Sequence, residues 1–175
     1  FGEFDFALDS PDKLASSGLE PIDAVVPGNV ELDLVRAGKL PDPFVGNNIF
    51  ELPPYETHQW WYLRAFNTPA AWSGRETVLA FDGLDCLATV WLNGQVVGVC
   101  ENMLVPCSFD VTSLLQPAGH PNELAVQIRS AVCAARAKRY EPSQVAMATN
   151  YEQLHIRKAP HMYGWDIAPR AVSAG

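Results

Sequence analysis

Residues 88–97 read Ala-Thr-Val-Trp-Leu-Asn-Gly-Gln-Val-Val, two β-rich runs separated by the dipeptide Asn93-Gly94. A two-residue type I′ turn needs a positive φ at both central positions, which asparagine and glycine tolerate best. The stretch therefore predicts a β-hairpin whose strands are residues 88–92 and 95–97. It is the clearest local signal in the chain.

Further segments on both sides of the hairpin have the pattern of strands. Residues 60–65 alternate between two faces, and residues 123–129 place leucine, valine and isoleucine at every second position. Residues 77–81 and 104–109 are two more β-rich runs that lie next to turn residues. Because no helices alternate with these strands, we expect an all-β fold. The predicted architecture is an antiparallel β-sandwich with one or two short helices, formed by residues 1–175 as a single domain.

Helix signals are sparse. Asn29 is a favourable N-cap for a helix over residues 30–37, and Gly38 follows where helices usually stop. Residues 131–139 are rich in alanine and end in basic side chains, which suit the C-terminal end of a helix dipole. Residues 110–115 are predicted to form one short capped turn.

Two segments are predicted to be irregular. Residues 40–54 contain four prolines, which interrupt regular backbone hydrogen bonding. Residues 141–175 show no sustained periodicity and contain three prolines. A long irregular segment inside a compact domain is unusual, and such segments are often functional.

The composition argues against several classes of partner. Of the 175 residues 48% are hydrophobic and 18% are charged, and the net charge is −8. Such a chain is poorly suited to nucleic acid, whose phosphates call for basic patches. No apolar run approaches the roughly 20 residues of a transmembrane helix, so we expect no membrane partner. The acidic start does not fit a signal peptide; periplasmic or extracellular export would require a signal outside this sequence.

The four cysteines are Cys86, Cys100, Cys107 and Cys133. Their spacing matches no paired zinc motif, and they are too few for a disulfide scaffold. We therefore expect free, mostly buried thiols. Cys100 and Cys107 bracket a turn, so a disulfide between them is the alternative in an oxidising compartment.

The sequence lacks the motifs of an autonomous enzyme. Its four histidines do not lie at metal-ligand spacing, and no Gly-x-Ser-x-Gly turn accompanies them. We expect no metal and no cofactor. Glu123 follows Asn122, but it opens an alternating strand, so we assign it no catalytic role.

Residues 151–170, here called the tail, crowd aromatic, basic and acidic side chains together. Aromatic rings cover the C–H faces of sugars, and charged groups hydrogen-bond to their hydroxyls, so this mixture suits a carbohydrate. The alternative is structural. In that interpretation Tyr163 and Trp165 fill an edge of the sandwich, while Asp166 pairs with Arg157 or Arg170.

A series of short motifs runs along the chain: Val26-Pro-Gly-Asn-Val-Glu-Leu-Asp-Leu34, Pro41-Asp-Pro-Phe44, Trp60-Trp-Tyr62, Phe81-Asp-Gly-Leu-Asp85, Ala88-Thr-Val-Trp-Leu-Asn-Gly94, Glu101-Asn-Met103, Asn122-Glu-Leu124, Ile156-Arg-Lys-Ala159, Gly164-Trp-Asp166 and Pro169-Arg170. In this order they resemble the N-terminal part of β-mannosidases of glycoside hydrolase family 2. The resemblance covers nearly the whole chain. It implies a jelly-roll, galactose-binding-like sandwich, the sugar-binding domain that precedes an immunoglobulin-like domain and a (β/α)₈ barrel.

The resemblance also implies which domain carries the catalytic residues. In the family the barrel carries both catalytic glutamates of a retaining mechanism, whose carboxyls lie about 5 Å apart. The chain is then a fragment of a larger multidomain glycosidase. It has no catalytic residue of its own and should be inactive alone.

The segment Gly164-Trp-Asp166 matches a loop that, in the family, reaches the rim of the barrel and shapes the pocket for the terminal sugar. The resemblance implies that Trp165 walls this pocket and that Asp166 accepts hydrogen bonds from sugar hydroxyls. Arg157 and Arg170 complete the predicted substrate-binding set.

The family sequence usually continues with Trp-Gly, where this chain has Ile167-Ala168. The loss of one aromatic ring leaves β-galactosides, β-glucuronides and β-glucosaminides as alternative substrates. Two other functions stay open, a stand-alone lectin-like module and a scaffold that braces the barrel. We also expect that an unpaired strand edge of the truncated sandwich permits self-association.

Overall fold

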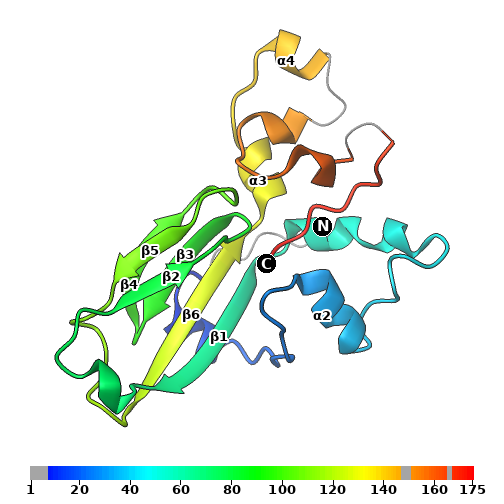
Figure 1. The fold of residues 1–175 in the computed structure, drawn as a ribbon. Helices are drawn as coiled ribbons and strands as arrows, with labels where there is room; N and C mark the ends of the chain where they lie inside the picture. The colour runs from blue at the N-terminus through cyan, green and yellow to red at the C-terminus, as the bar shows by residue number, and fades with distance from the viewer. Residues whose placement is uncertain (1–7, 147–150, 165–166) are drawn as a thin grey trace.

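The computed structural model describes residues 8–146, 151–164 and 167–175. Its strands form two antiparallel sheets, and most of the short helices lie at one end of the sheets or beside one edge (Figure 1). The larger sheet has the order β1-β6-β3-β4, and the smaller pairs β2 with β5. The strands are β1 (Trp60–Asn67), β2 (Val78–Phe81), β3 (Leu87–Leu92), β4 (Gln95–Cys100), β5 (Cys107–Asp110) and β6 (Pro121–Arg129). The predicted antiparallel β-sandwich is confirmed.

Strands β3 and β4 form the predicted hairpin. Asn93 and Gly94 have φ angles of 52° and 76°, the pair of positive values that a type I′ turn needs. β3 also pairs along its length with β6. The hairpin therefore joins an inner strand of the larger sheet to its edge.

The core between the sheets follows from the alternation of the strands. Val90, Val126 and Ile128 face inward and are 0%, 5% and 1% exposed. Side chains of the smaller sheet pack against them, Phe109 among them. A Cβ on Gly98 would lie 2.2 Å from the Phe109 ring, so only glycine lets β4 approach this ring so closely. Each buried aliphatic side chain contributes about 1.5–3 kcal/mol to folding.

At the end of the sandwich where the Asn93-Gly94 turn lies, Asn122 is fully buried. Its side chain hydrogen-bonds to three other segments. Its Nδ2 donates to Thr68 Oγ1 at 2.7 Å, and its Oδ1 accepts from Gln116 N and Asn93 Nδ2, both at 2.9 Å. Glu123, the next residue, is exposed. The Asn-Glu pair therefore has a structural member and a solvated one.

The helices follow the capping signals. Asn29 Oδ1 accepts from Leu32 N at 3.0 Å and starts α2 (Val30–Arg36), which confirms the predicted helix. Ser130 caps α3 (Ala131–Arg136) in the same way.

α3 ends earlier than the sequence predicts, because Lys138 N donates to Ala135 O in a tighter turn and Tyr140 donates its hydroxyl to the same carbonyl. Two short helices, α1 (Pro11–Ala15) and α4 (Pro142–Ala146), were not predicted. No helix within the described residues is long and apolar enough to cross a membrane.

Two of the remaining segments match the expectation, and β5 departs from it. Residues 110–115 form one turn, in which Leu115 N donates to Val111 O. Residues 40–54 are irregular apart from η1 (Asn48–Glu51) and the start of η2 (Pro53–Thr57), two 3₁₀ turns. β5 is shorter than the predicted strand, because Pro106 has no amide hydrogen and Leu104 N donates to Asn102 Oδ1 in a turn.

Cys100 and Cys107 form a disulfide across the β4–β5 connection. Their Cα atoms lie 6.4 Å apart, within the distance that a disulfide spans. The expectation of free thiols is therefore wrong for this pair, because the two sheets bring the ends of β4 and β5 together. Cys86 and Cys133 are free.

The chain after β6 leaves the sheets and packs against their end (Figure 1). It forms α3, α4, η4 (Tyr151–Leu154) and η5 (Pro160–Met162), and then returns beside α2 and β1. This part has its own apolar cluster, in which Val132 and Tyr163 are completely buried. The irregular tail is thus packed against the end of the sandwich through its own apolar cluster.

We expect the substitution Asn122→Ala to lower the free energy of unfolding by about 2–4 kcal/mol, because it leaves several buried polar groups without partners. Denaturant titration measures this. Glu123→Gln is the matched control and should stay within about 0.5 kcal/mol of wild type, as expected for an exposed position. An equal effect of both substitutions would contradict the structural role of Asn122.

Candidate functional site

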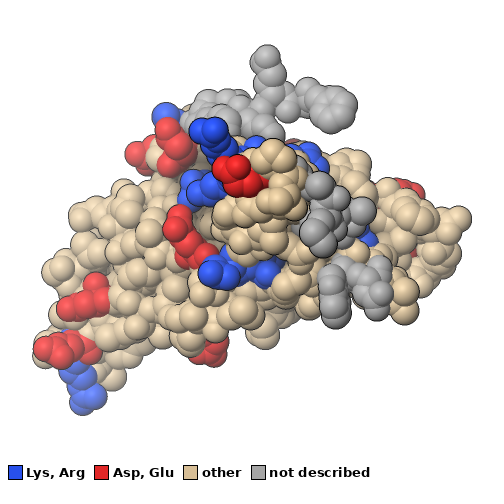
Figure 2. Space-filling view, turned by 90° about the horizontal axis from the view of Figure 1, so that it is seen from above, with Lys and Arg blue, Asp and Glu red and all other residues tan. Residues whose placement is uncertain are grey.

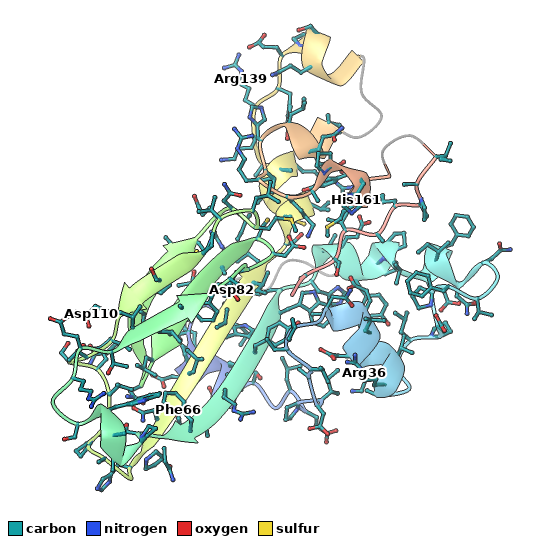
Figure 3. All side chains as sticks on the ribbon, viewed as in Figure 1. Arg36, Phe66, Asp82, Asp110, Arg139 and His161 are labelled. Atoms are coloured by element: carbon teal, nitrogen blue, oxygen red, sulfur yellow. A yellow bond between two sulfur atoms is a disulfide. The ribbon has the colours of Figure 1, made fainter. Side chains whose placement is uncertain are left out.

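The predicted sugar-contacting residues all belong to the tail. Trp165 and Asp166 lie outside the described residues. Ile167, which follows them, is 95% exposed. Arg157 is exposed, whereas Arg170 is partly buried, so the structure places the two predicted arginines in different environments. His161, labelled in Figure 3, lies in η5 near the base of this region.

The Arg170 guanidinium lies between two carboxylates. Its Nε donates to both oxygens of Glu56, at 2.9 and 3.0 Å, and its Nη2 donates to Glu56 Oε2 at 2.8 Å. Its Nη1 donates to Glu152 Oε2 at 3.2 Å. Burial alone would lower the pKa of Arg170, but the hydrogen bonds and charges of these two acids raise it above its ordinary value. All three guanidinium nitrogens are therefore directed at carboxylates.

The two carboxylates that hold Arg170 are themselves buried. The side chains of Glu56 and Glu152 are 6% and 4% exposed. Glu152 also pairs with Arg136 of α3, at 3.1 Å between Oε1 and Nη2. Two arginines thus neutralise two buried acids, a group here called the arginine clamp. Figure 2 shows blue and red side chains side by side on this end of the molecule.

A second buried ion pair holds the earlier part of the tail. The Lys158 side chain has no exposed surface, and its Nζ lies 2.5 Å from Asp85 Oδ2. It also donates to the Ser173 carbonyl. Burial raises the pKa of Asp85, while the charge of Lys158 acts in the opposite direction. The tail is therefore tied both to the start of β3 and to the last residues of the chain.

Residues 173–175 are fixed on their other side by α2 and the start of β3. The Ser173 hydroxyl donates to Glu31 Oε2 at 2.5 Å, and Ala174 O accepts from Val30 N at 2.9 Å. Gly175 O accepts from Asp85 N at 2.8 Å. Burial raises the pKa of Glu31, partly offset by the Ser173 hydrogen bond.

Tyr163 is completely buried beside the arginine clamp. Among the described residues its hydroxyl has no hydrogen-bond partner, and burial raises its pKa. Arg170 Cζ lies 5.7 Å from the centre of its ring. The expectation that Tyr163 plugs an edge of the sandwich is close to its observed position, since it fills the apolar cluster between the tail and the sheets.

Arg157 lies where the tail crosses the β4–β5 connection. It forms a parallel β-bridge with Asn102, and its carbonyl accepts from Met103 N at 3.0 Å. Ala159 N in turn donates to Met103 Sδ at 3.0 Å. The backbone of Arg157 is thus fixed while its side chain is exposed.

The charged groups described above hold the tail in place. Asp85, Glu56 and Glu152 are each paired with a cation of the tail. No group of His, Cys, Asp or Glu side chains in the described ranges is arranged to hold a metal ion. This arrangement can position the tail.

A shallow surface groove lies beside η2. It has a volume of about 530 Å³ and is lined by Phe50, Glu51, Pro54, Tyr55 and His58. The His58 ring stacks on Trp60, with centroids 5.7 Å apart. Aromatic faces next to a carboxylate are compatible with a sugar ring. No sequence pattern marks this groove, because its residues lie in a proline-rich segment without periodicity.

The carboxylates of the clamp could not be predicted from local sequence patterns either. Glu56 and Glu152 lie 114 and 18 residues before Arg170, in 3₁₀ turns without a recognisable motif. The available signal was the excess of cations in the tail, since a buried arginine needs acidic partners.

The chain was compared with known protein families, sequences and structures. Residues 11–175 match the family described as glycosyl hydrolase 2 galactose-binding domain-like. The chain is 37% identical over 152 residues to β-mannosidase B of Thermothelomyces thermophilus, which covers 85% of the chain and 18% of that protein. It is 35% identical over 170 residues to β-mannosidase B of Aspergillus clavatus, covering 95% of the chain and 20% of that protein.

Among solved structures, the crystal structure of β-D-mannosidase from Dictyoglomus thermophilum superposes with a TM-score of 0.79 at 35% identity. The superposition covers 87% of this chain and 19% of that one. The chain thus spans about a fifth of the length of these relatives.

We expect Lys158→Met to lower the free energy of unfolding by about 3–5 kcal/mol, because it leaves the Asp85 carboxylate buried without its cation. The double variant with Asp85→Asn should lose less than the sum of the two single variants, as measured by denaturant titration. Lys13→Met is the matched control, because its pair with Asp9 is exposed, and it should unfold like wild type. Strict additivity of the two buried substitutions would refute the coupling.

Proposed function

The chain belongs to the glycosyl hydrolase 2 galactose-binding domain-like family, and we propose that it serves as the N-terminal, non-catalytic sugar-binding domain of a longer retaining exo-β-glycosidase of the β-mannosidase type. The catalytic glutamates would lie in a barrel encoded beyond this sequence. In a retaining enzyme their carboxyls would be about 5 Å apart. The chain alone would then bind its sugar weakly and hydrolyse nothing.

The observation that carries the proposal is the way the tail is held on both sides of residues 164–169. Tyr163 precedes this segment and is completely buried, and Arg170 follows it in the arginine clamp. Ile167, in between, is 95% exposed. An apolar side chain presented on an anchored base suits a segment that meets another surface.

We assign the sugar contacts of this segment to Trp165 and Asp166, on the resemblance of Gly164-Trp-Asp166 to the family loop. Trp165 would cover a face of the terminal sugar, and Asp166 would accept hydrogen bonds from its hydroxyls. The exposed Arg157 completes the proposed set. The sequence also predicts Arg170 as a sugar contact, and in the fold its nitrogens are engaged by Glu56 and Glu152.

The preferred sugar is proposed to be a β-mannoside, since the relatives named above are β-mannosidases. Ile167-Ala168 departs from the family sequence at the position of an aromatic ring. For this reason β-galactosides, β-glucuronides and β-glucosaminides stay alternative substrates. A panel of aryl β-glycosides tested on the full-length protein would rank them.

We expect Asp166→Ala in the full-length protein to lower kcat/KM for aryl β-mannosides by about 10- to 100-fold, because it removes a charged hydrogen-bond acceptor. The isolated 175-residue chain should show no hydrolysis. Glu123→Gln, at an exposed position on β6, is the control and should leave kcat/KM unchanged. An unaltered kcat/KM in the Asp166 variant would favour a scaffold that only braces the barrel.

The groove beside η2 favours a second candidate function, a module that binds carbohydrate by itself. In that case calorimetric titration of the isolated chain with mannose and short mannosides should give a measurable Kd. Phe50→Ala should abolish this binding. Phe44→Ala should not, because Phe44 is also an exposed phenylalanine but lies outside the groove. Absence of heat with the wild-type chain would exclude this function for these ligands.

Self-association stays a proposal. β1 is an edge strand of the larger sheet, and β2 and β5 form a sheet of only two strands in the described part of the chain. Unpaired strand edges favour association with another strand. Size-exclusion chromatography over a range of concentrations measures it.

A further inference from the structure

We propose that Arg170 is a positioning residue, and that the arginine clamp of Arg170, Glu56, Glu152 and Arg136 fixes the two ends of residues 164–169 against the body of the domain. The purpose rests on the proposed function, in which this segment presents the sugar contacts. The clamp itself rests on contacts between described residues. The inference replaces the sequence-based assignment of Arg170 as a sugar contact.

The hydrogen-bonding capacity of Arg170 is used inside the protein. Its Nε, Nη1 and Nη2 all donate to Glu56 or Glu152, at distances of 2.8–3.4 Å. A planar guanidinium has five N–H donors in a fixed geometry. Turning the fork toward a sugar would uncover two buried carboxylates, which is strongly unfavourable.

The backbone on the two sides of residues 164–169 is paired. Tyr163 and Arg170 form an antiparallel β-bridge, and Ala171 N donates to Met162 O at 2.9 Å. The residues that flank this segment, Tyr163 and Arg170, therefore lie side by side. Because Arg170 belongs to this bridge, its side chain fixes both ends of the segment at once.

The other members of the clamp come from separate elements of the fold. Glu56 lies in η2, Glu152 in η4 and Arg136 in α3. The Ser130 hydroxyl, at the start of α3, also donates to Glu56 O at 2.6 Å. The clamp therefore ties residues 164–169 to three separate elements, one of them more than a hundred residues earlier in the chain.

The charges of the clamp balance one another. The clamp holds two cations and two anions, and both carboxylates are almost completely buried. Such a group is stable only when complete, because removal of one member leaves a buried charge without a partner. A positioning role follows, since the geometry of the bridge depends on every member of the clamp.

The test compares Arg170→Lys and Glu152→Gln in the full-length protein. Lysine keeps the charge of Arg170 but loses the planar fork, and the Glu152 side chain is too buried to reach a sugar. Hydrogen exchange of residues 164–169 and the kinetics of aryl β-mannoside hydrolysis are measured well below the unfolding temperature. Arg36→Lys is the matched control, because Arg36 pairs with Asp33 in α2, outside the clamp.

We expect both clamp variants to speed exchange in residues 164–169 and to lower kcat/KM by about 10- to 100-fold. The double variant should be no worse than Arg170→Lys alone, because both substitutions disable the same clamp. The Arg36 variant should match wild type in exchange and kinetics.

Two results would overturn the inference. One is unchanged exchange of residues 164–169 in both clamp variants. The other is a loss of activity in the Arg170 variant without any loss in the Glu152 variant, which would restore Arg170 as a direct sugar contact. Failure of the proposed function is seen separately. In that case Asp166→Ala would leave kcat/KM unchanged, while the clamp variants would still speed exchange.

Discussion

The ammonium group of Lys158 is the constraint on which the arrangement of the tail depends. A lysine without exposed surface must be neutralised and hydrogen-bonded where it lies, and here Asp85 and the Ser173 carbonyl do so. These partners belong to the start of β3 and to the last residues of the chain. The pair therefore fixes two segments at once, and the hydrogen bond from Ser173 to Glu31 extends this attachment to α2.

The arginine clamp repeats the same principle farther along the tail. Lys158 ties down the earlier part, and Arg170 ties down the part that returns beside α2 and β1. Both use carboxylates from elements that are distant in sequence. The sandwich supplies a rigid platform, and the tail is attached to it by charge pairs in addition to the apolar cluster around Tyr163. Buried charge pairs have strict geometry, which suits a segment whose position matters more than its contribution to stability.

The sequence predicted what depends on neighbouring residues. Asn93-Gly94 specified the hairpin, alternation specified β1 and β6, and Asn29 specified the start of α2. It did not predict the partners of Arg170 and Lys158, because no local pattern links residues tens of positions apart. For the same reason the disulfide stood only as an alternative. The sugar contacts assigned to Trp165 and Asp166 rest on resemblance, and they stay predictions.

The Asn93-Gly94 turn also bears on the chemical ageing of the protein. An asparagine before glycine loses its side-chain amide most readily, through attack of the following backbone nitrogen on the side-chain carbonyl. In the fold, Asn93 Nδ2 donates to Leu114 O and Asn122 Oδ1, and its Oδ1 accepts from Glu123 N. These hydrogen bonds restrain the side-chain amide on which that attack would have to occur. The network that closes this end of the sandwich therefore also protects the dipeptide that forms the hairpin, and local unfolding there would expose a covalent weak point.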